Sequence, residues 1–195
     1  ACQDPNPQVG GSGIRFLRDN GCELRVGVLE DQARWLNRRF MVFHTLKRPY
    51  IVLKWAQSAD GFIDRLRNQA SVTGPNWITP PHLRMLVHKW RSEESAIWVG
   101  RQTVVADNPR LNLREWPGTN PLRVIMDSRL SLPENSHVLD QSQPTVVFNE
   151  IKDETIGNIR YIRYDQSLDT LQDILSHLYR MNILSVLVEG GSRLL

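Results

Sequence analysis

The stretch L-D-T-L-Q-D-I-L-S-H-L-Y-R-M-N-I-L-S-V-L-V-E, residues 168–189, decides the fold class of this chain. Its first part repeats apolar residues at helical spacing and predicts a helix over 168–181. Its second part predicts a buried strand over 185–189, and residues 160–164 predict another strand just before the helix. A strand, a helix and a strand in succession are the unit from which parallel α/β sheets are built.

The same alternation extends toward the N-terminus. Further strands are predicted at residues 50–55, 96–100, 122–127 and 145–148. A helix is predicted from Thr79-Pro80 to about Arg91, with Thr79 as its capping hydroxyl and Pro80 at its first position. Its apolar stripe is formed by Leu83, Leu86, Val87 and Trp90. The chain is therefore predicted to form an α/β fold, with a mostly parallel sheet and flanking helices.

Residues 1 to about 46 form a separate short unit. A helix is predicted near 13–19, a strand over 23–28, and one helix near 30–44 with Trp35, Leu36 and Phe40 on its apolar stripe. So short a unit cannot bury a core of its own. The chain also begins without Met and stops just after a buried-type strand, so we expect both ends to be cut from a longer protein.

Composition limits the class of protein. The chain has 195 residues, 41% of them hydrophobic, and a net charge of +3, which indicates a soluble protein with one full core. Its basic residues are scattered among acids, so no nucleic-acid-binding face is predicted. The apolar runs are too short to span a membrane. Cys2, Cys22 and the five histidines show no metal-binding spacing, so we expect a cytoplasmic protein without a metal site here.

The segment T-V-V-A-D-N-P-R-L-N-L-R, residues 103–114, follows the predicted strand 96–100. Open α/β sheets bind ligands in loops at the carboxyl ends of their strands. Thr103, Asp107 and Arg114 are therefore placed to hold a phosphorylated ligand. Asp-Asn-Pro is also ordinary turn chemistry, so a structural turn without a ligand is the alternative.

Two charged residues accompany buried-type strands. Lys54 lies in one and Glu189 ends another, so we expect the two charges to pair. The structural explanation is an ion pair, or a lysine on an exposed edge strand. The functional explanation is a polar pocket floor that binds the hydroxyl groups of a substrate. The turn Gly190-Gly191-Ser192 suits a phosphate group, although it falls short of a dinucleotide fingerprint and a plain tight turn is the alternative.

Arg91 and Trp77 also suit a ligand site. Arg91 and Arg114 could clamp one phosphate group with their planar guanidinium groups. Trp77 either packs in the core or lies against a flat ring. The sequence shows no nucleophile with a base and no metal cluster. This set of groups favours a reaction in which a cofactor brings the reactive group, such as hydride transfer from a nicotinamide.

Several segments resemble, in order and spacing, the reductase domain of the bacterial bifunctional deaminase/reductase of riboflavin biosynthesis. They are R-P-Y-I-V-L-K-W-A-Q-S-A-D-G (48–61), N-W-I-T (76–79), H-K-W-R-S-E-E-S-A-I-W-V-G (88–100), residues 103–114, V-I-M-D-S (124–128) and V-E-G-G (188–191). The resemblance covers residues 47–195. Residues 1–46, with D-P-N-P and G-V-L-E, look like the remnant of the family's deaminase domain, a cytidine-deaminase-like α/β domain. The zinc motifs H-x-E and P-C are absent here.

The resemblance implies a dihydrofolate-reductase-like fold, NADPH as the cofactor, and reduction of the ribosyl group of 5-amino-6-(5-phosphoribosylamino)uracil to the ribityl form. It implies that the sugar is lined by the catalytic residues Lys54, Asp107 and Glu189, and that its 5-phosphate is bound by Arg91, Arg114 and the Leu111 backbone. The residues implied to face the cofactor are Ala56, Asp60, Trp77, Thr103, Asp107, Ser128, Gly190, Gly191, Ser192 and Arg193. Pro75 stands where many relatives carry a small hydroxyl residue, so no substrate hydrogen bond is expected there. A parent protein with a zinc deaminase domain and a homodimer are also expected.

Two other classes of function stay open at this point. One is a related reductase acting on a pterin or folate-like compound, for which a phosphate clamp has little use. The other is a nucleotide-binding module without turnover.

Overall fold

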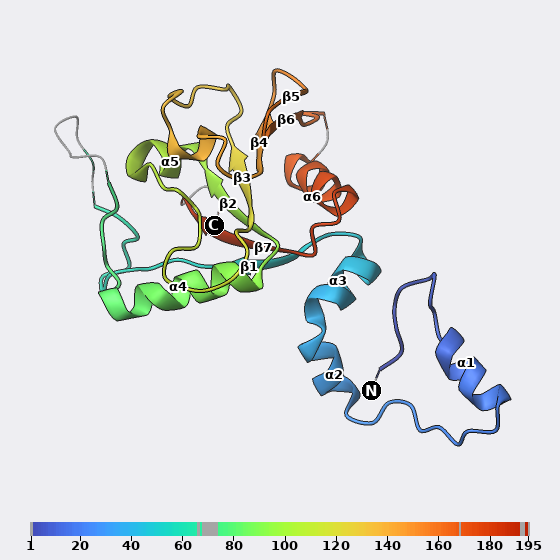
Figure 1. The fold of residues 1–195 in the computed structure, drawn as a ribbon. Coiled ribbons are helices and arrows are strands. Elements are labelled where there is room, and N and C mark those ends of the chain that lie inside the picture. The colour runs from blue at the N-terminus through green and yellow to red at the C-terminus, as the bar shows by residue number, and fades with distance from the viewer. Residues whose placement is uncertain (1, 66, 68–73, 168, 192–193, 195) are drawn as a thin grey trace. The chain divides into compact units, whose positions relative to one another are not determined.

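The computed structural model describes residues 2–65, 67, 74–167, 169–191 and 194 (Figure 1). The chain divides into two compact units. The first unit comprises Ala1–Tyr50 with Leu175–Leu184, and the second comprises Ile51–Ile174 with Ser185–Leu195. The predicted boundary after residue 46 lies close to this division, although the first unit also takes in a later part of the chain.

A seven-stranded sheet in the order β1-β7-β2-β3-β4-β6-β5 organises the fold. The strands are β1 (Tyr50–Leu53), β2 (Ala96–Gly100), β3 (Leu122–Met126), β4 (Thr145–Asn149), β5 (Glu154–Ile156), β6 (Ile159–Arg163) and β7 (Ser185–Gly190). From β7 through β2, β3 and β4 to β6 neighbouring strands run parallel, whereas β5 pairs antiparallel with β6. The predicted mostly parallel sheet is confirmed.

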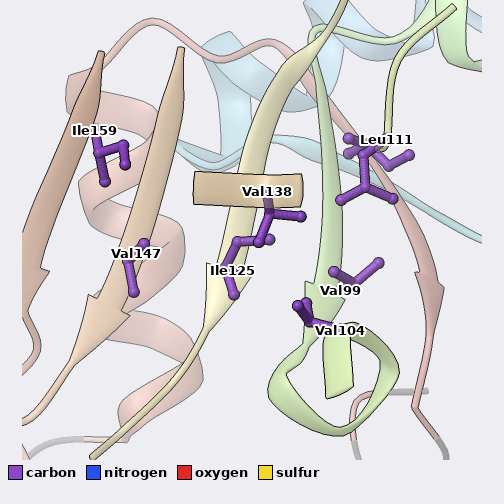
Figure 2. Packing of buried hydrophobic residues seen from close by; sticks show 8 residues of the cluster. Val99, Val104, Leu111, Ile125, Val138, Val147 and Ile159 are labelled. Atoms are coloured by element: carbon purple, nitrogen blue, oxygen red, sulfur yellow. The ribbon is translucent and has the colours of Figure 1, made fainter. Parts of the chain in front are cut away.

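The core lies against one face of the central strands. Figure 2 shows side chains from β2, β3, β4 and β6 together with residues that follow β2 and β3 along the chain. They are Ile97, Val99, Val104, Leu111, Ile125, Val138, Val147 and Ile159. The intervening residues Trp98 and Val124 are also buried. Strands that are apolar on both faces are typical of a parallel sheet covered on both sides.

The helices that accompany the sheet are α4 (Pro81–Glu93), α5 (Arg101–Asp107) and α6 (Thr170–Arg180), with a short 3₁₀ turn at His137–Leu139. Helix α6 confirms most of the predicted 168–181 helix, and Leu168 lies outside the described residues. Helix α4 is confirmed, but its predicted cap is wrong. Pro80 is the N-cap, without a side-chain hydrogen bond, and the proline inside the first turn is Pro81.

Helix α5 corrects the prediction of a loop over residues 103–114, because the segment stays helical up to Asp107. Val104 in this helix is 1% exposed and packs in the core, which stabilises the helical turn. The helix ends at Asn108, whose φ of 43° is left-handed, and Pro109 follows it. The ordinary turn chemistry of Asn-Pro therefore ends the helix, and the Asn108 side chain also accepts a hydrogen bond from the His137 backbone N–H at 2.8 Å.

The first unit contains α1 (Ser12–Asp19), α2 (Glu30–Leu36) and α3 (Arg38–Leu46). The predicted helix near 13–19 is confirmed. The predicted strand over 23–28 is wrong, since this segment is irregular and Gly27 has a φ of 86°.

The single helix predicted over 30–44 is also wrong. Asn37 divides it, and its side-chain amide donates a hydrogen bond to the Ala33 carbonyl at 2.9 Å. Trp35 and Leu36 are 66% and 76% exposed, so they form no buried stripe. In the part of the chain that the structure describes, no helix is long and apolar enough to cross a membrane.

Candidate active site

A cavity of about 610 Å³ lies within the second unit, where β1, β2 and β7 end. Its volume falls in the usual range for small-molecule sites. It collects predicted site residues that are as far apart in sequence as 54 and 191. Those that line it are Lys54, Ala56, Trp77, Arg91, Thr103, Asp107, Leu111, Arg114, Glu189, Gly190 and Gly191.

Two described cofactor candidates, Asp60 and Ser128, are not in this lining. Asp60 accepts a hydrogen bond from the Ser58 hydroxyl at 2.5 Å. Ser128 shares one with the Tyr164 hydroxyl at 2.7 Å. Ser192 and Arg193 lie outside the described residues. The cofactor and substrate roles of all the predicted site residues stay predictions.

Glu189 pairs with Arg91, not with Lys54 as predicted. The Nε and Nη2 atoms of Arg91 donate to the two Glu189 carboxylate oxygens at 2.8 and 2.6 Å. The two side chains are only 11% and 7% exposed. Lys54 follows the edge strand β1, which ends at Leu53 and is not a central strand. Among the described residues, Lys54 acts on Glu189 through its charge and forms no ion pair with it.

The Arg91–Glu189 pair is charged on both sides. Burial would raise the pKa of Glu189, but the charge and hydrogen bonds of Arg91, with help from Lys54, lower it below its ordinary value. Burial would likewise lower the pKa of Arg91, and Glu189 outweighs this and raises it. Both pKa shifts favour the charged forms of the pair, so Glu189 is a carboxylate and not a proton donor at neutral pH.

Helix α4 turns a polar face to the cavity. Arg84, His88 and Arg91 all line it, and their i, i+4, i+7 spacing places them on one side of the helix. Of the predicted apolar stripe only Val87 lines the cavity, whereas Leu83, Leu86 and Trp90 are 40%, 38% and 42% exposed. The apolar pattern of α4 therefore does not mark the face that the helix turns to the cavity.

His88 is a buried residue of the site that the sequence analysis did not select. Its Nδ1 accepts a weak 3.4 Å hydrogen bond from the Arg114 backbone N–H. Burial, followed by the positive charges of Arg91 and Arg114, lowers its pKa below the ordinary value. His88 is thus a neutral imidazole at neutral pH, and it links α4 to the segment that carries Arg114.

Asp107 is the last residue of α5 and is held by Arg67. The Arg67 Nη2 donates to Asp107 Oδ1 at 2.8 Å, while its Nε donates to Asp64 Oδ2 at 2.7 Å. Burial raises the pKa of Asp107 above its ordinary value, and the charge of Arg67 opposes this only in part. Three carboxyl groups line the cavity: the pKa of Asp107 is raised, whereas the pKa values of Asp64 and Glu189 are lowered.

A glycine turn forms another wall. Gly190 and Gly191 have φ values of 146° and 88°, which side-chain-bearing residues rarely adopt. A Cβ atom on either residue would lie 3.5 Å from the Thr103 hydroxyl. The turn therefore brings two residues without side chains next to this hydroxyl group.

Trp77 lies at the cavity with its ring 57% exposed, so it is not a core residue. The Arg84 guanidinium lies 4.2 Å from the ring centroid and packs against one face of the indole. Among the residues that the structure describes, no group of three or more His, Cys, Asp or Glu side chains could hold a metal ion.

The fold and the cavity together define an α/β domain of the dihydrofolate-reductase-like class, with its ligand site at the carboxyl ends of parallel strands. The chain belongs to the RibD C-terminal domain family, which matches residues 49–195.

Relatives match both units. The chain is 37% identical to the riboflavin biosynthesis protein RibD of Aquifex aeolicus over 100% of its own length and 55% of that protein. The RibD of Bacillus amyloliquefaciens is also 37% identical, with coverages of 98% and 53%. The chain thus spans about half the length of the curated relatives that it matches.

A solved structure is similar along nearly the whole chain. The diaminohydroxyphosphoribosylaminopyrimidine deaminase/5-amino-6-(5-phosphoribosylamino)uracil reductase of Thermotoga maritima superposes with a TM-score of 0.85 and is 38% identical. The match covers 98% of this chain and 53% of the Thermotoga chain.

Proposed function

We propose that this chain is the reductase part of a bifunctional protein and reduces the ribosyl group of 5-amino-6-(5-phosphoribosylamino)uracil to the ribityl form, with NADPH as the cofactor. The observation that carries the proposal is one cavity that combines arginines, a lysine and three carboxyl groups with a glycine turn. The Thermotoga relative, whose name includes this reductase activity, supports the choice of substrate.

We extend the proposal to the rest of the protein by the same likeness. Residues 1–46 are assigned to the end of a deaminase domain. The zinc ion of that domain is assigned to a part of the parent protein that this chain does not include. We also propose that the protein acts as a cytoplasmic homodimer.

The wall of the cavity suits a dinucleotide. Gly190 and Gly191 carry no side chain beside the Thr103 hydroxyl, so a phosphate group could approach their backbone closely. The exposed ring of Trp77 offers a flat surface for an aromatic ring. NADPH, when bound, would supply the hydride. Ala56, Ser192 and Arg193 complete the residues that we assign to it, together with Asp60 and Ser128.

The substrate phosphate is assigned to Arg91 and Arg114. Arg91 already donates three N–H groups, two to Glu189 and one to the Asn112 carbonyl at 3.2 Å. Arg114 donates one, to the Asn112 side chain at 2.8 Å, and is exposed. Since a guanidinium group has five N–H donors, Arg114 has more of them left for a phosphate. The Leu111 backbone completes this end of the site.

Asp107 and Glu189 receive different roles. Opening of the ribose ring breaks the bond between its anomeric carbon and its ring oxygen, and this oxygen takes up one proton as it becomes a hydroxyl. Asp107, with its raised pKa, is suited to hold that proton. Glu189, with its lowered pKa, stays ionised beside Arg91 and Lys54 and accepts hydrogen bonds from the sugar hydroxyls.

NADPH oxidation by the full-length protein tests this proposal. Asp107→Asn and Lys54→Ala should each lower kcat by at least about 10²-fold, since loss of a positioned acid or charge has this effect. The exposed Asp31→Asn in the first unit is the matched control and should retain full activity. Retained turnover in both cavity variants would contradict the proposal.

Two further outcomes separate the alternatives. Equal activity on the dephosphorylated substrate would favour a reductase for pterin or folate-like compounds. If NADPH in large excess leaves the Tm of the protein unchanged, the assignment of this cofactor is wrong.

A further inference from the structure

We propose that Arg67, which has no role in the assignments above, positions the Asp107 carboxylate at the cavity wall. The inference rests on the proposed function only for the chemical meaning of Asp107. The geometry itself is independent of the ligand, because every contact that carries it lies within the chain.

Arg67 is almost fully occupied by the protein. Its Nε donates to Asp64, and its Nη2 donates to Asp107. Its Nη1 donates to the carbonyl oxygens of Gly74 at 3.0 Å and Ala106 at 2.9 Å. Four of its five N–H donors are thus engaged, and its side chain is only 19% exposed. Arg67 therefore binds groups of the protein itself, and only one of its N–H donors remains for a ligand phosphate.

These contacts tie separate segments to the end of α5. The Ala106 carbonyl is one of the terminal helix carbonyls that lack a partner inside the helix, and it also accepts from the Gly74 backbone N–H at 2.9 Å. A positive charge at a helix C-terminus is stabilising. Arg67 therefore fixes both the last turn of α5 and the carboxylate that the turn presents.

The planar fork of arginine is needed for this arrangement. It reaches two carboxylates and two carbonyls from one rigid plane, whereas a lysine offers a single nitrogen. We expect a lysine at position 67 to preserve the charge near Asp107 but to lose the fixed orientation of its carboxylate.

Removal of the charge should change the titration of Asp107. Burial and the neighbouring Asp64 raise the pKa of Asp107, and Arg67 is the group that lowers it. Without Arg67 the carboxyl group should therefore stay protonated to a higher pH. The other titratable side chains that line the cavity are Lys54, Arg84, His88, Arg91, Arg110, Arg114, His137 and Glu189.

The test compares Arg67→Gln, Arg67→Lys and Arg65→Gln in the full-length protein. Arg65 lies two residues away with an exposed side chain, so Arg65→Gln is the matched control for loss of one positive charge. The ¹³C-carboxyl NMR titration of Asp107, assigned by its absence in Asp107→Asn, is the first measurement. We expect its pKa to rise in Arg67→Gln, because the charge of Arg67 lowers it in the wild type, and to stay near the wild-type value in the control and in Arg67→Lys.

The pH profile of kcat/KM is the second measurement. The limb of the profile that disappears in Asp107→Asn should move to higher pH in Arg67→Gln. Arg67→Lys should keep this limb at its wild-type pH, and its kcat should fall about tenfold, as for a misplaced catalytic group. Circular dichroism establishes that each variant is folded. If Arg67→Gln does not fold, a wild-type kcat in Arg67→Lys overturns the proposal.

The outcomes for the two proposals are distinct. An Asp107 titration in Arg67→Gln that superimposes on the wild type overturns the positioning role, whatever the activity. A wild-type protein without reductase activity overturns the proposed function, and the NMR titration then decides the role of Arg67 by itself.

Discussion

Replacement of Glu189 by glutamine should destabilise the protein by about 3 kcal/mol, the lower end of what loss of one partner costs a buried ion pair. The carboxylate accepts two charge-assisted hydrogen bonds from Arg91, at 2.6 and 2.8 Å. Each such bond contributes roughly 1.5–3 kcal/mol. Glutamine keeps one acceptor oxygen but turns an amide group toward the second N–H, so the buried Arg91 charge loses its counterion.

Thermal unfolding followed by circular dichroism measures this loss. For a chain of this size, about 3 kcal/mol corresponds to a fall in Tm of roughly 6–12 °C. Glu93→Gln is the matched control, because Glu93 pairs with Lys89 at 3.9 Å and both side chains are 44% exposed. Its effect should be below about 0.5 kcal/mol.

A double variant separates lost attraction from an unpaired buried charge. Arg91→Met/Glu189→Leu should be more stable than Glu189→Gln, because neither charge is left alone in the interior, although it should lack reductase activity. The reasoning is refuted if Glu189→Gln and Glu93→Gln have the same stability.

Acid should act on the same pair. Because the folded-state pKa of Glu189 is lowered, its stabilisation is complete above its ordinary value of 4.5 and is lost as pH falls through the lowered folded-state value. The difference in stability between the wild type and Glu189→Gln should therefore shrink below about pH 4.5.

The remaining predictions concern the core and the glycine turn. Arg123→Met should cost about 3–5 kcal/mol in urea unfolding, since Arg123 is 1% exposed and its loss leaves Asp140 and the Arg110 carbonyl without their 2.9 Å hydrogen bonds. An unchanged urea midpoint would contradict this. Gly191→Ala places a Cβ at a φ of 88°, a strain of about 1–3 kcal/mol, and should raise the Kd for NADPH more than that for the substrate in a fluorescence titration. An equal rise in both would argue against a turn specific to the cofactor.

Much of the site was readable from residue types and their order. Lys54, Arg91, Asp107 and Glu189 were all selected from the sequence, and all of them line the cavity. Each is a charged residue near the end of a strand or helix, which is where α/β folds place their ligand sites. The hydrogen-bond partners of these residues could not be predicted from the sequence. Glu189 pairs with Arg91, 98 positions away. The two meet because β7, which carries Glu189, lies between β1 and β2, the two strands that α4 connects.

Two missed residues show the same limit. Arg67 lies 40 positions before Asp107 in a segment without periodicity, so no local pattern links the two. His88 had a usable signal, its i+4 and i−3 spacing from Arg84 and Arg91 on α4. The exposed apolar residues of that helix concealed this signal, because an apolar stripe is normally the buried face.

The amino-acid sequence by itself determined the order of strands β1, β2, β3, β4, β6 and β7 and of helices α4 and α6, the parallel α/β class and the identity of most charged residues at the cavity. These properties depend on local periodicity and residue type, which act within a few residues along the chain. Tertiary structure alone decided that residues 101–107 form a helix, that Arg91 neutralises Glu189 and that Arg67 holds Asp107. Hydrogen bonds and ion pairs depend on distances of a few ångströms between atoms, and only the folded sheet sets those distances for residues far apart in sequence.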